Sequence, residues 1–145
     1  MILIAHRGNL RGKSVNFENH PEYVDLALKQ DFDAEIDIWY QDGLFLGHDE
    51  PKFKIEESWL SKRNDKLWLH CKNIKAIEWF YGKQDFNYFW HQEDTLTITS
   101  KGYIWVYPDK QPVNNSIAVL PELHPDIDTS KCIGVCSDFL KDFKV

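Results

Sequence analysis

Ala34-Glu35-Ile36-Asp37-Ile38 is the stretch that decides the fold, because apolar and charged side chains alternate along it. Successive side chains of a β-strand point to opposite faces, so the apolar ones share one face and Glu35 and Asp37 share the other. On a closed barrel this second face points inward, where two carboxylates repel each other unless a cation lies between them. On an edge strand, the alternative, both carboxylates would face water.

The N-terminal stretch is a continuous apolar run, Ile2-Leu3-Ile4-Ala5, that ends at His6-Arg7-Gly8. Such a run is typical of a strand buried on both faces. It places the polar triplet at the C-terminal end of the strand, where barrel enzymes carry their active sites. Downstream, Asn19 followed by Glu22 resembles a capping box, which predicts a helix over residues 20–30.

A tight turn is predicted at Asp42-Gly43, which lies between two apolar stretches. The resulting hairpin would fold His48-Asp49 back over the mouth of the barrel, opposite His6. Residues 67–72 predict a third strand, followed by a helix over residues 73–81.

Helical signals almost vanish after Gly82, and turn residues separate a series of short β-like runs. These runs are residues 88–91, 96–99, 103–107, 117–120 and 133–136. Together with the first three strands they give eight candidate strands, the number in a (β/α)8 barrel.

The length of 145 residues allows one domain over residues 1–145. A complete (β/α)8 barrel normally takes roughly 200–250 residues. The predicted fold is therefore α/β, a reduced (β/α)8 TIM-like barrel with most outer helices missing. Its outer strand faces would need cover, which the many Trp and Phe side chains could supply, or a second subunit in a homo-oligomer.

Charge and composition limit the partners. The formal net charge of -6 argues against a nucleic-acid surface, which depends on a basic patch. The sequence shows no signal peptide and no apolar stretch that would cross a membrane. Three cysteines, the last two spaced C-x3-C, indicate free thiols rather than a zinc ribbon. We therefore expect a cytoplasmic protein that binds neither nucleic acid nor membranes.

Two histidines bracket the acidic pair in the first 49 residues. His6 and His48 can divide the work of general base and general acid, because an imidazole titrates near neutral pH. Glu35 and Asp37 can hold a divalent cation that neutralises a phosphate. This combination indicates a metal-assisted site for phosphodiester cleavage. We expect structural roles for the three histidines His20, His91 and His124.

Five short motifs stand in a fixed order over 44 residues: His-Arg-Gly, Glu-Asn, Glu-x-Asp, Asp-Gly and His-Asp. In this order the chain resembles the glycerophosphodiester phosphodiesterase family, part of the phosphatidylinositol-phospholipase-C-like phosphodiesterase superfamily. The likeness is strong over residues 1–50 and patchy from residue 51 onward. It implies attack by a neighbouring substrate hydroxyl, which gives a cyclic phosphate that can then be hydrolysed; the residues alone leave attack by water equally open.

The resemblance also implies roles for four further residues. Arg7 and Lys72 would contact the substrate phosphate, while Glu18 and Asn19 would support the site by orienting His6 or by reaching the metal through water.

At the third metal ligand the chain departs from the family, because relatives carry Glu-x-Lys where this chain has His70-Cys71-Lys72. His70 can still coordinate, although imidazole suits Mn, Zn or Ni better than Ca, so Mg, Ca and Mn all remain candidates. Glu122 could replace the missing acidic ligand, or be an ordinary surface residue. The last strand is similar to the family's, and Asp138 is expected to be a structural hydrogen-bond acceptor.

These observations predict a metal-dependent phosphodiesterase that acts on a small glycerophosphodiester-like or sugar-linked diester. A barrel that binds a phosphorylated ligand without turning it over is one alternative, and a metal-storage or structural metal site is another. A phospholipase-like lyase is a further one, disfavoured because no basic amphipathic helix is evident.

Overall fold

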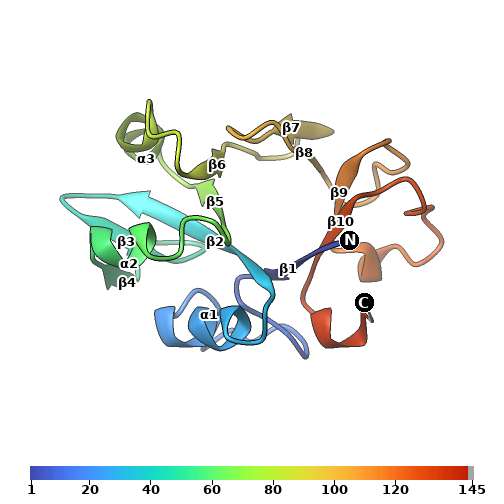
Figure 1. Ribbon diagram of the computed structural model, residues 1–145, viewed down its shortest axis with the longest axis horizontal. Coiled ribbons are helices and arrows are strands. Elements are labelled where there is room, and N and C mark those ends of the chain that lie inside the picture. The colour runs from blue at the N-terminus through green and yellow to red at the C-terminus, as the bar shows by residue number, and fades with distance from the viewer. Residues whose placement is uncertain (144–145) are drawn as a thin grey trace.

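The computed structural model describes residues 1–143 and contains one ten-stranded mixed sheet with few helices (Figure 1). The strands are β1 (Ile2–His6), β2 (Asp33–Tyr40), β3 (Leu44–Leu46), β4 (Phe53–Ile55), β5 (Leu67–Cys71), β6 (Asn87–Phe89), β7 (Leu96–Ile98), β8 (Ile104–Val106), β9 (Ser116–Val119) and β10 (Gly134–Ser137). The helices are α1 (Pro21–Leu28), α2 (Glu57–Ser61) and α3 (Ile74–Phe80), with two 3₁₀ turns, η1 (Pro121–Leu123) and η2 (Leu140–Asp142).

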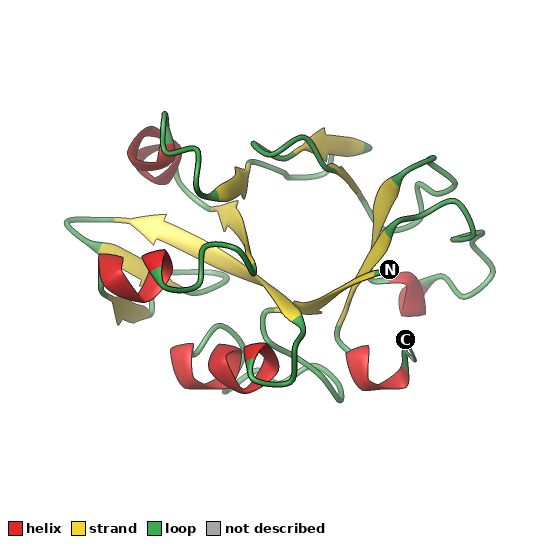
Figure 2. Ribbon diagram, viewed as in Figure 1, coloured by secondary structure: helices red, strands yellow, loops and turns green. Residues whose placement is uncertain are grey.

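Parallel pairing runs through seven strands in the order β6-β5-β2-β1-β10-β9-β8. The short strands β3 and β4 continue as an antiparallel meander from the end of β2, and β7 pairs antiparallel with β8. The sheet curves so that the helices lie on its outside (Figure 2). Its two ends approach each other where the Ser100 amide donates to the Tyr88 carbonyl at 2.8 Å.

The inner face of the sheet carries an apolar cluster built from six strands. Its buried members are Ile4, Trp68, Phe89, Trp105, Ile117 and Cys136. The rings of Phe89 and Trp105 are 4.7 Å apart between centroids, and those of Trp68 and Trp105 are 5.7 Å apart. Strands from both ends of the sheet therefore share one core.

The outer face confirms the alternation predicted for β2. Ala34, Ile36 and Ile38 are fully buried in an outer cluster with α1, α2, α3 and the β3–β4 meander, whereas Glu35 and Asp37 point to the inner face. A second outer cluster, which includes Leu3, Val135 and Leu140, covers β1 and β10. Burial of the apolar side chains on one face sets the direction of the two carboxylates.

Every predicted strand overlaps an observed one, and the predicted helices 20–30 and 73–81 appear as α1 and α3. The predicted capping box is wrong. His20 is the N-cap of α1, where its Nδ1 accepts from the Glu22 amide at 3.2 Å, because Asn19 turns its side chain to Asp37 instead. Helix α2 and strand β4 were not predicted, since both are very short. Within the described residues, no helix combines the length and apolar character needed to span a membrane.

Candidate active site

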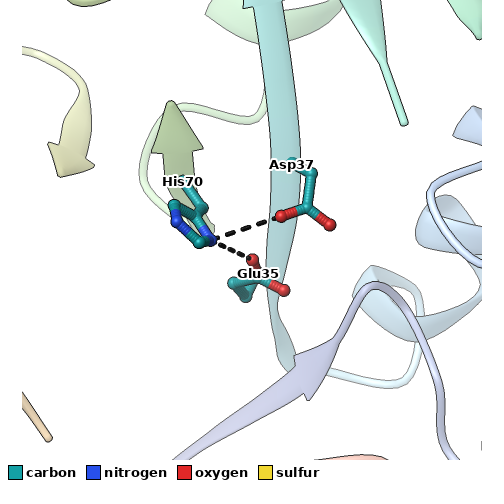
Figure 3. Close-up of side chains that lie close together, drawn as sticks. All are labelled: Glu35, Asp37 and His70. Atoms are coloured by element: carbon teal, nitrogen blue, oxygen red, sulfur yellow. Dashed lines mark ion pairs between the residues drawn. The ribbon is translucent and has the colours of Figure 1, made fainter. Parts of the chain in front are cut away.

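The register of three parallel strands assembles the site. His6, the last residue of β1, lies opposite Glu35 in β2, and Asp37 lies opposite His70 in β5. Side chains opposite each other in a sheet project from the same face, so all four converge on the inner side. Figure 3 shows the His70 ring directed at both carboxylates.

Glu35, Asp37 and His70 form a compact cluster at the C-terminal end of the inner face. The His70 Nδ1 atom lies 3.3 Å from Asp37 Oδ1 and 3.7 Å from Glu35 Oε2. One ligand atom from each residue falls within 4.8 Å of the other two. Both carboxylates are almost fully buried, so the cluster holds two negative charges in an environment where charge must be paired.

Arg7 supplies a positive charge beside the cluster. Its Nε lies 3.1 Å from Asp37 Oδ2, and its Nη1 donates to Glu18 Oε1 at 3.1 Å. The backbone amide of Arg7 also donates to Glu35 Oε1 at 3.2 Å. A guanidinium has five N–H donors, so these contacts leave others for a ligand phosphate.

A tight turn after β1 places Arg7. Arg7 and Gly8 both adopt positive φ angles, 54° and 84°. A Cβ at Gly8 would lie 3.2 Å from the Val24 backbone of α1, and the left-handed conformation would strain any larger residue. Gly8 therefore lets α1 pack closely against the end of β1.

Asn19 anchors Asp37 at two points. Its Nδ2 donates to Asp37 Oδ2 at 2.9 Å, and its Oδ1 accepts from the Asp37 amide at 2.9 Å. The side chain is fully buried and its backbone has a φ of 68°. Asn19 thus holds Asp37, whereas the sequence predicted that it would orient His6 or reach a metal through water.

His6 is oriented by a residue from the far end of the chain. Its Nδ1–H donates to Asp138 Oδ1 at 2.7 Å, and its Nε2 lies 3.8 Å from Glu35 Oε1. Asn9, fully buried, donates to the same Asp138 oxygen at 2.9 Å. Asp138 is therefore the structural acceptor that the sequence predicts. The sequence analysis did not predict that Asp138 accepts from His6. The pairing of the first and last strands, which a closed barrel requires, would have indicated this contact.

The second nitrogen of His70 is also held. Its Nε2–H donates to the backbone carbonyl of His91 at 2.8 Å. In the neutral ring, with its proton on Nε2, the Nδ1 lone pair would face the carboxylates, whereas in the doubly protonated ring Nδ1–H faces them. This carbonyl partner leaves no signal in the sequence, because any residue could provide it.

Electrostatics follow from burial and from the ion pairs. Burial lowers the pKa of His70, but the carboxylates of Asp37 and Glu35 outweigh it and raise the pKa to about 9. Burial raises the pKa of Asp37, yet His70 and Arg7 together hold that pKa well below its ordinary value. Burial likewise lowers the pKa of His6, and the Asp138 hydrogen bond and the Glu35 charge give a net raised pKa.

His48 lies at the rim and not in the cluster. Its side chain is 41% exposed, and its Nδ1 is 2.8 Å from Asp49 Oδ1. It lines a cavity of about 140 Å³ together with Asn19, which contacts Asp37, and Glu18, which contacts Arg7. The predicted hairpin places it there, because the Gly47 amide donates to the Asp37 carbonyl at 3.1 Å. Within residues 1–143, His48 forms no hydrogen bond or ion pair with His6.

Lys72 and Glu122 form no hydrogen bond or ion pair with Glu35, Asp37 or His70 among the described residues. Lys72 follows β5, is half-buried and makes no ion pair within the described chain. Glu122 lies in η1, where its carboxylate accepts from Ser137 Oγ at 2.8 Å and from the Asp138 amide at 3.0 Å. Both of its oxygens are thereby used to hold the end of β10, and the predicted role as a metal ligand finds no support.

The cluster fits a divalent cation by one specific observation. Asp37 Oδ1 is buried and has no hydrogen-bond partner among the described residues. A carboxylate oxygen left without a partner in the interior is costly, and a bound cation would remove that cost. Two carboxylate oxygens and one imidazole nitrogen are an ordinary donor set for such an ion.

Comparison with known proteins adds no assignment. No family model matches the chain, and no curated protein and no solved structure is significantly similar to it.

Proposed function

We propose that the protein is a metal-dependent phosphodiesterase that cleaves a small glycerophosphodiester-like or sugar-linked diester with His6 and His48 as acid–base pair. The observation that carries the proposal is the strand register, which sets His6 beside Glu35 and His70 beside Asp37. An oriented imidazole can act as a general base, and an acidic cluster beside it can hold the cation that stabilises the phosphate charge.

We propose further that the curved sheet is a reduced (β/α)8 barrel with most outer helices missing. Seven parallel strands and the antiparallel β7 would form its eight strands. The hydrogen bonds between Tyr88 and Ser100 would close it. The shared cluster of Phe89 and Trp105 supports closure. Nuclear Overhauser contacts between these two rings are the expected result, and their absence would contradict closure.

In the proposed reaction, His6 acts as the base. Its Nδ1–H is committed to Asp138, which leaves Nε2 to take a proton from the attacking group, a neighbouring substrate hydroxyl or, on a diester without one, a water molecule. Arg7 and Lys72 are proposed to orient the phosphate oxygens, and a bound divalent cation would neutralise their charge. His48, exposed at the rim, would give a proton to the leaving oxygen.

Two substrates separate the two histidine roles. On an alkyl diester such as bis(glycero)phosphate, we expect His6→Ala and His48→Ala each to lower turnover by about 10²–10⁴-fold. On bis(p-nitrophenyl) phosphate the leaving phenolate needs no proton, so His48→Ala should cost much less while His6→Ala costs the same. His124→Ala, outside the cluster, is the matched control and should leave both rates unchanged. Wild-type protein that turns over neither diester with Mn²⁺, Mg²⁺ or Ca²⁺ would refute the proposal.

The position of His48 favours a second candidate, a domain that binds a phosphorylated ligand without cleaving it. His48 pairs with Asp49 and its side chain is 41% exposed, so the second imidazole is not held at the cluster. Saturable binding of glycerol phosphate without turnover of either diester would favour this candidate.

A further inference from the structure

The third corner of the acidic cluster is a nitrogen ligand. From this we infer that the cation held by Glu35, Asp37 and His70 is a first-row transition metal such as Mn²⁺, Co²⁺ or Zn²⁺, bound through His70 Nδ1, and not Ca²⁺ or Mg²⁺. The inference concerns the same site as the proposed function and rests on its being a metal site.

The His70 ring is fixed in the orientation that ligation needs. Its Nε2–H is held by the His91 carbonyl at 2.8 Å, and its plane stacks on Phe89 with centroids 5.0 Å apart and 14° between the planes. Metal-bound histidines characteristically donate their second nitrogen to such an acceptor, which fixes both the tautomer and the ring. The neutral ring then has its Nδ1 lone pair beside the two carboxylates.

The two carboxylate oxygens of Asp37 have different surroundings. Its Oδ2 accepts a hydrogen bond from Asn19 Nδ2 and lies 3.1 Å from Arg7 Nε, so these two side chains hold that oxygen in place. Its Oδ1 is buried without a hydrogen-bond partner and faces His70 Nδ1 at 3.3 Å. One ligand atom each from Asp37, His70 and Glu35 lies within 4.8 Å of the other two, a separation that one cation can bridge.

The donor set selects the class of cation. Ca²⁺ takes six to eight oxygen ligands, and Mg²⁺ prefers carboxylates, phosphates and water in octahedral geometry. Imidazole nitrogen suits first-row transition metals, whose affinity for mixed nitrogen and oxygen sites exceeds that of the hard cations. His70 supplies a nitrogen where a carboxylate would supply a hard oxygen, so the site should prefer first-row transition metals over Ca²⁺ and Mg²⁺.

The competing state is a proton in place of the metal. A doubly protonated His70 would form an ion pair with both carboxylates and satisfy the cluster without any cation. The protein would then bind no divalent metal here, which the experiment below detects directly.

The experiment uses chelator-stripped protein and two readouts that do not depend on turnover. Titration calorimetry compares Mn²⁺, Zn²⁺, Ca²⁺ and Mg²⁺, and pulsed electron paramagnetic resonance of bound Mn²⁺ detects a directly coordinated ¹⁴N nucleus. We expect Mn²⁺ to bind at least about tenfold more tightly than Ca²⁺, with a clear ¹⁴N signal.

Three variants identify the nitrogen. His70→Glu should abolish the ¹⁴N signal and narrow the gap between Mn²⁺ and Ca²⁺ by about tenfold or more. His6→Ala should retain the signal, because His6 faces the cluster but is not the inferred ligand. His124→Gln is the matched control and should behave as wild type. Circular dichroism checks folding, and His70→Asn replaces His70→Glu if the latter fails to fold.

The outcomes separate this inference from the proposed function. Diester turnover with Mn²⁺ that lacks a ¹⁴N signal, or with equal affinity for Ca²⁺, overturns the inference and leaves the phosphodiesterase standing. Nitrogen-bound Mn²⁺ without turnover of either diester supports the inference and overturns the phosphodiesterase. Failure of every metal to bind overturns the inference and shows that the cluster is an ion-paired triad.

Discussion

The two halves of the molecule, before and after Tyr81, differ in what covers the outer faces of their strands. All three α-helices of the described chain lie before Tyr81, and they pack on the outer face of β2 and β5. After Tyr81 the outer side is covered by two 3₁₀ turns and loops, and β7 exposes Leu96 and Ile98. The second half instead contributes Phe89, Trp105 and Ile117 to the inner cluster.

This difference shows where the candidate site can form. In the first half the acidic cluster lies on β2 and β5, whose outer faces pack against helices. This apolar packing stabilises the two strands and offsets the cost of burying Glu35 and Asp37 on their inner faces. The second half fills the interior with aromatic and aliphatic side chains, and it contributes to the site Asp138, the His91 carbonyl and the Phe89 ring that stacks on His70. Four predictions test this division, in order of decreasing effect.

Trp105→Ala should be the most damaging change, because it opens a cavity in the cluster that both halves share. We expect a loss of about 3–5 kcal/mol in the free energy of unfolding, as for other buried Trp side chains. Urea unfolding followed by circular dichroism measures it. Trp79→Ala, on the half-buried face of α3, is the matched control and should cost less. Equal losses would show that the second half does not depend on its interior.

The stability of the metal-free protein should fall as pH rises through the slightly basic range. Burial lowers the pKa of His70 but its two carboxylates raise it to about 9, above the ordinary 6.5. A raised folded-state pKa stabilises the fold fully below pH 6.5, and this contribution, at most roughly 3 kcal/mol, is lost as pH approaches and passes about 9.

Urea unfolding in the presence of EDTA across this range measures the effect. His70→Gln should flatten the pH dependence between 6.5 and about 9. Bound Mn²⁺ should reverse its sign, because a metal needs the unprotonated ring. A wild-type curve that is already flat would contradict the ion-paired cluster.

Asn19→Gly should separate the support of the site from backbone strain. Glycine accepts the φ of 68° at this position, so the change removes the buried side chain and its two hydrogen bonds to Asp37 without straining the backbone. We expect a loss of about 1–3 kcal/mol in unfolding free energy and about 10–100-fold in Mn²⁺ affinity. Calorimetry and urea unfolding give the two values, and unchanged metal affinity would rule out Asn19 as the support of Asp37.

Ile98→Thr should have the smallest effect. The side chain is 62% exposed on β7, and threonine keeps the β-branched shape that suits a strand. Unfolding free energy should change by no more than about 0.5 kcal/mol. A much larger loss would mean that this face is covered in solution, as the predicted homo-oligomer would cover it.

Local patterns in the sequence predicted much of this arrangement. The alternation around Glu35 and Asp37 sets which face each residue takes, because a strand has a period of two. The turn at Asp42-Gly43 is recognisable because both residues adopt the positive φ angles that hairpin turns require. In contrast, the short α2 and β4 carry too few residues to leave a periodic signal.

By itself the sequence determined the order of the motifs, the face of each strand residue and the chemistry of the side chains, since these depend on neighbours along the chain. Only the tertiary structure decided that Asp138 orients His6 across 132 positions, that the His91 carbonyl orients His70, and that Glu122 holds β10 instead of joining the cluster. These contacts join strands that are adjacent in the sheet but distant in the chain, and their register is set by the packing of the whole domain.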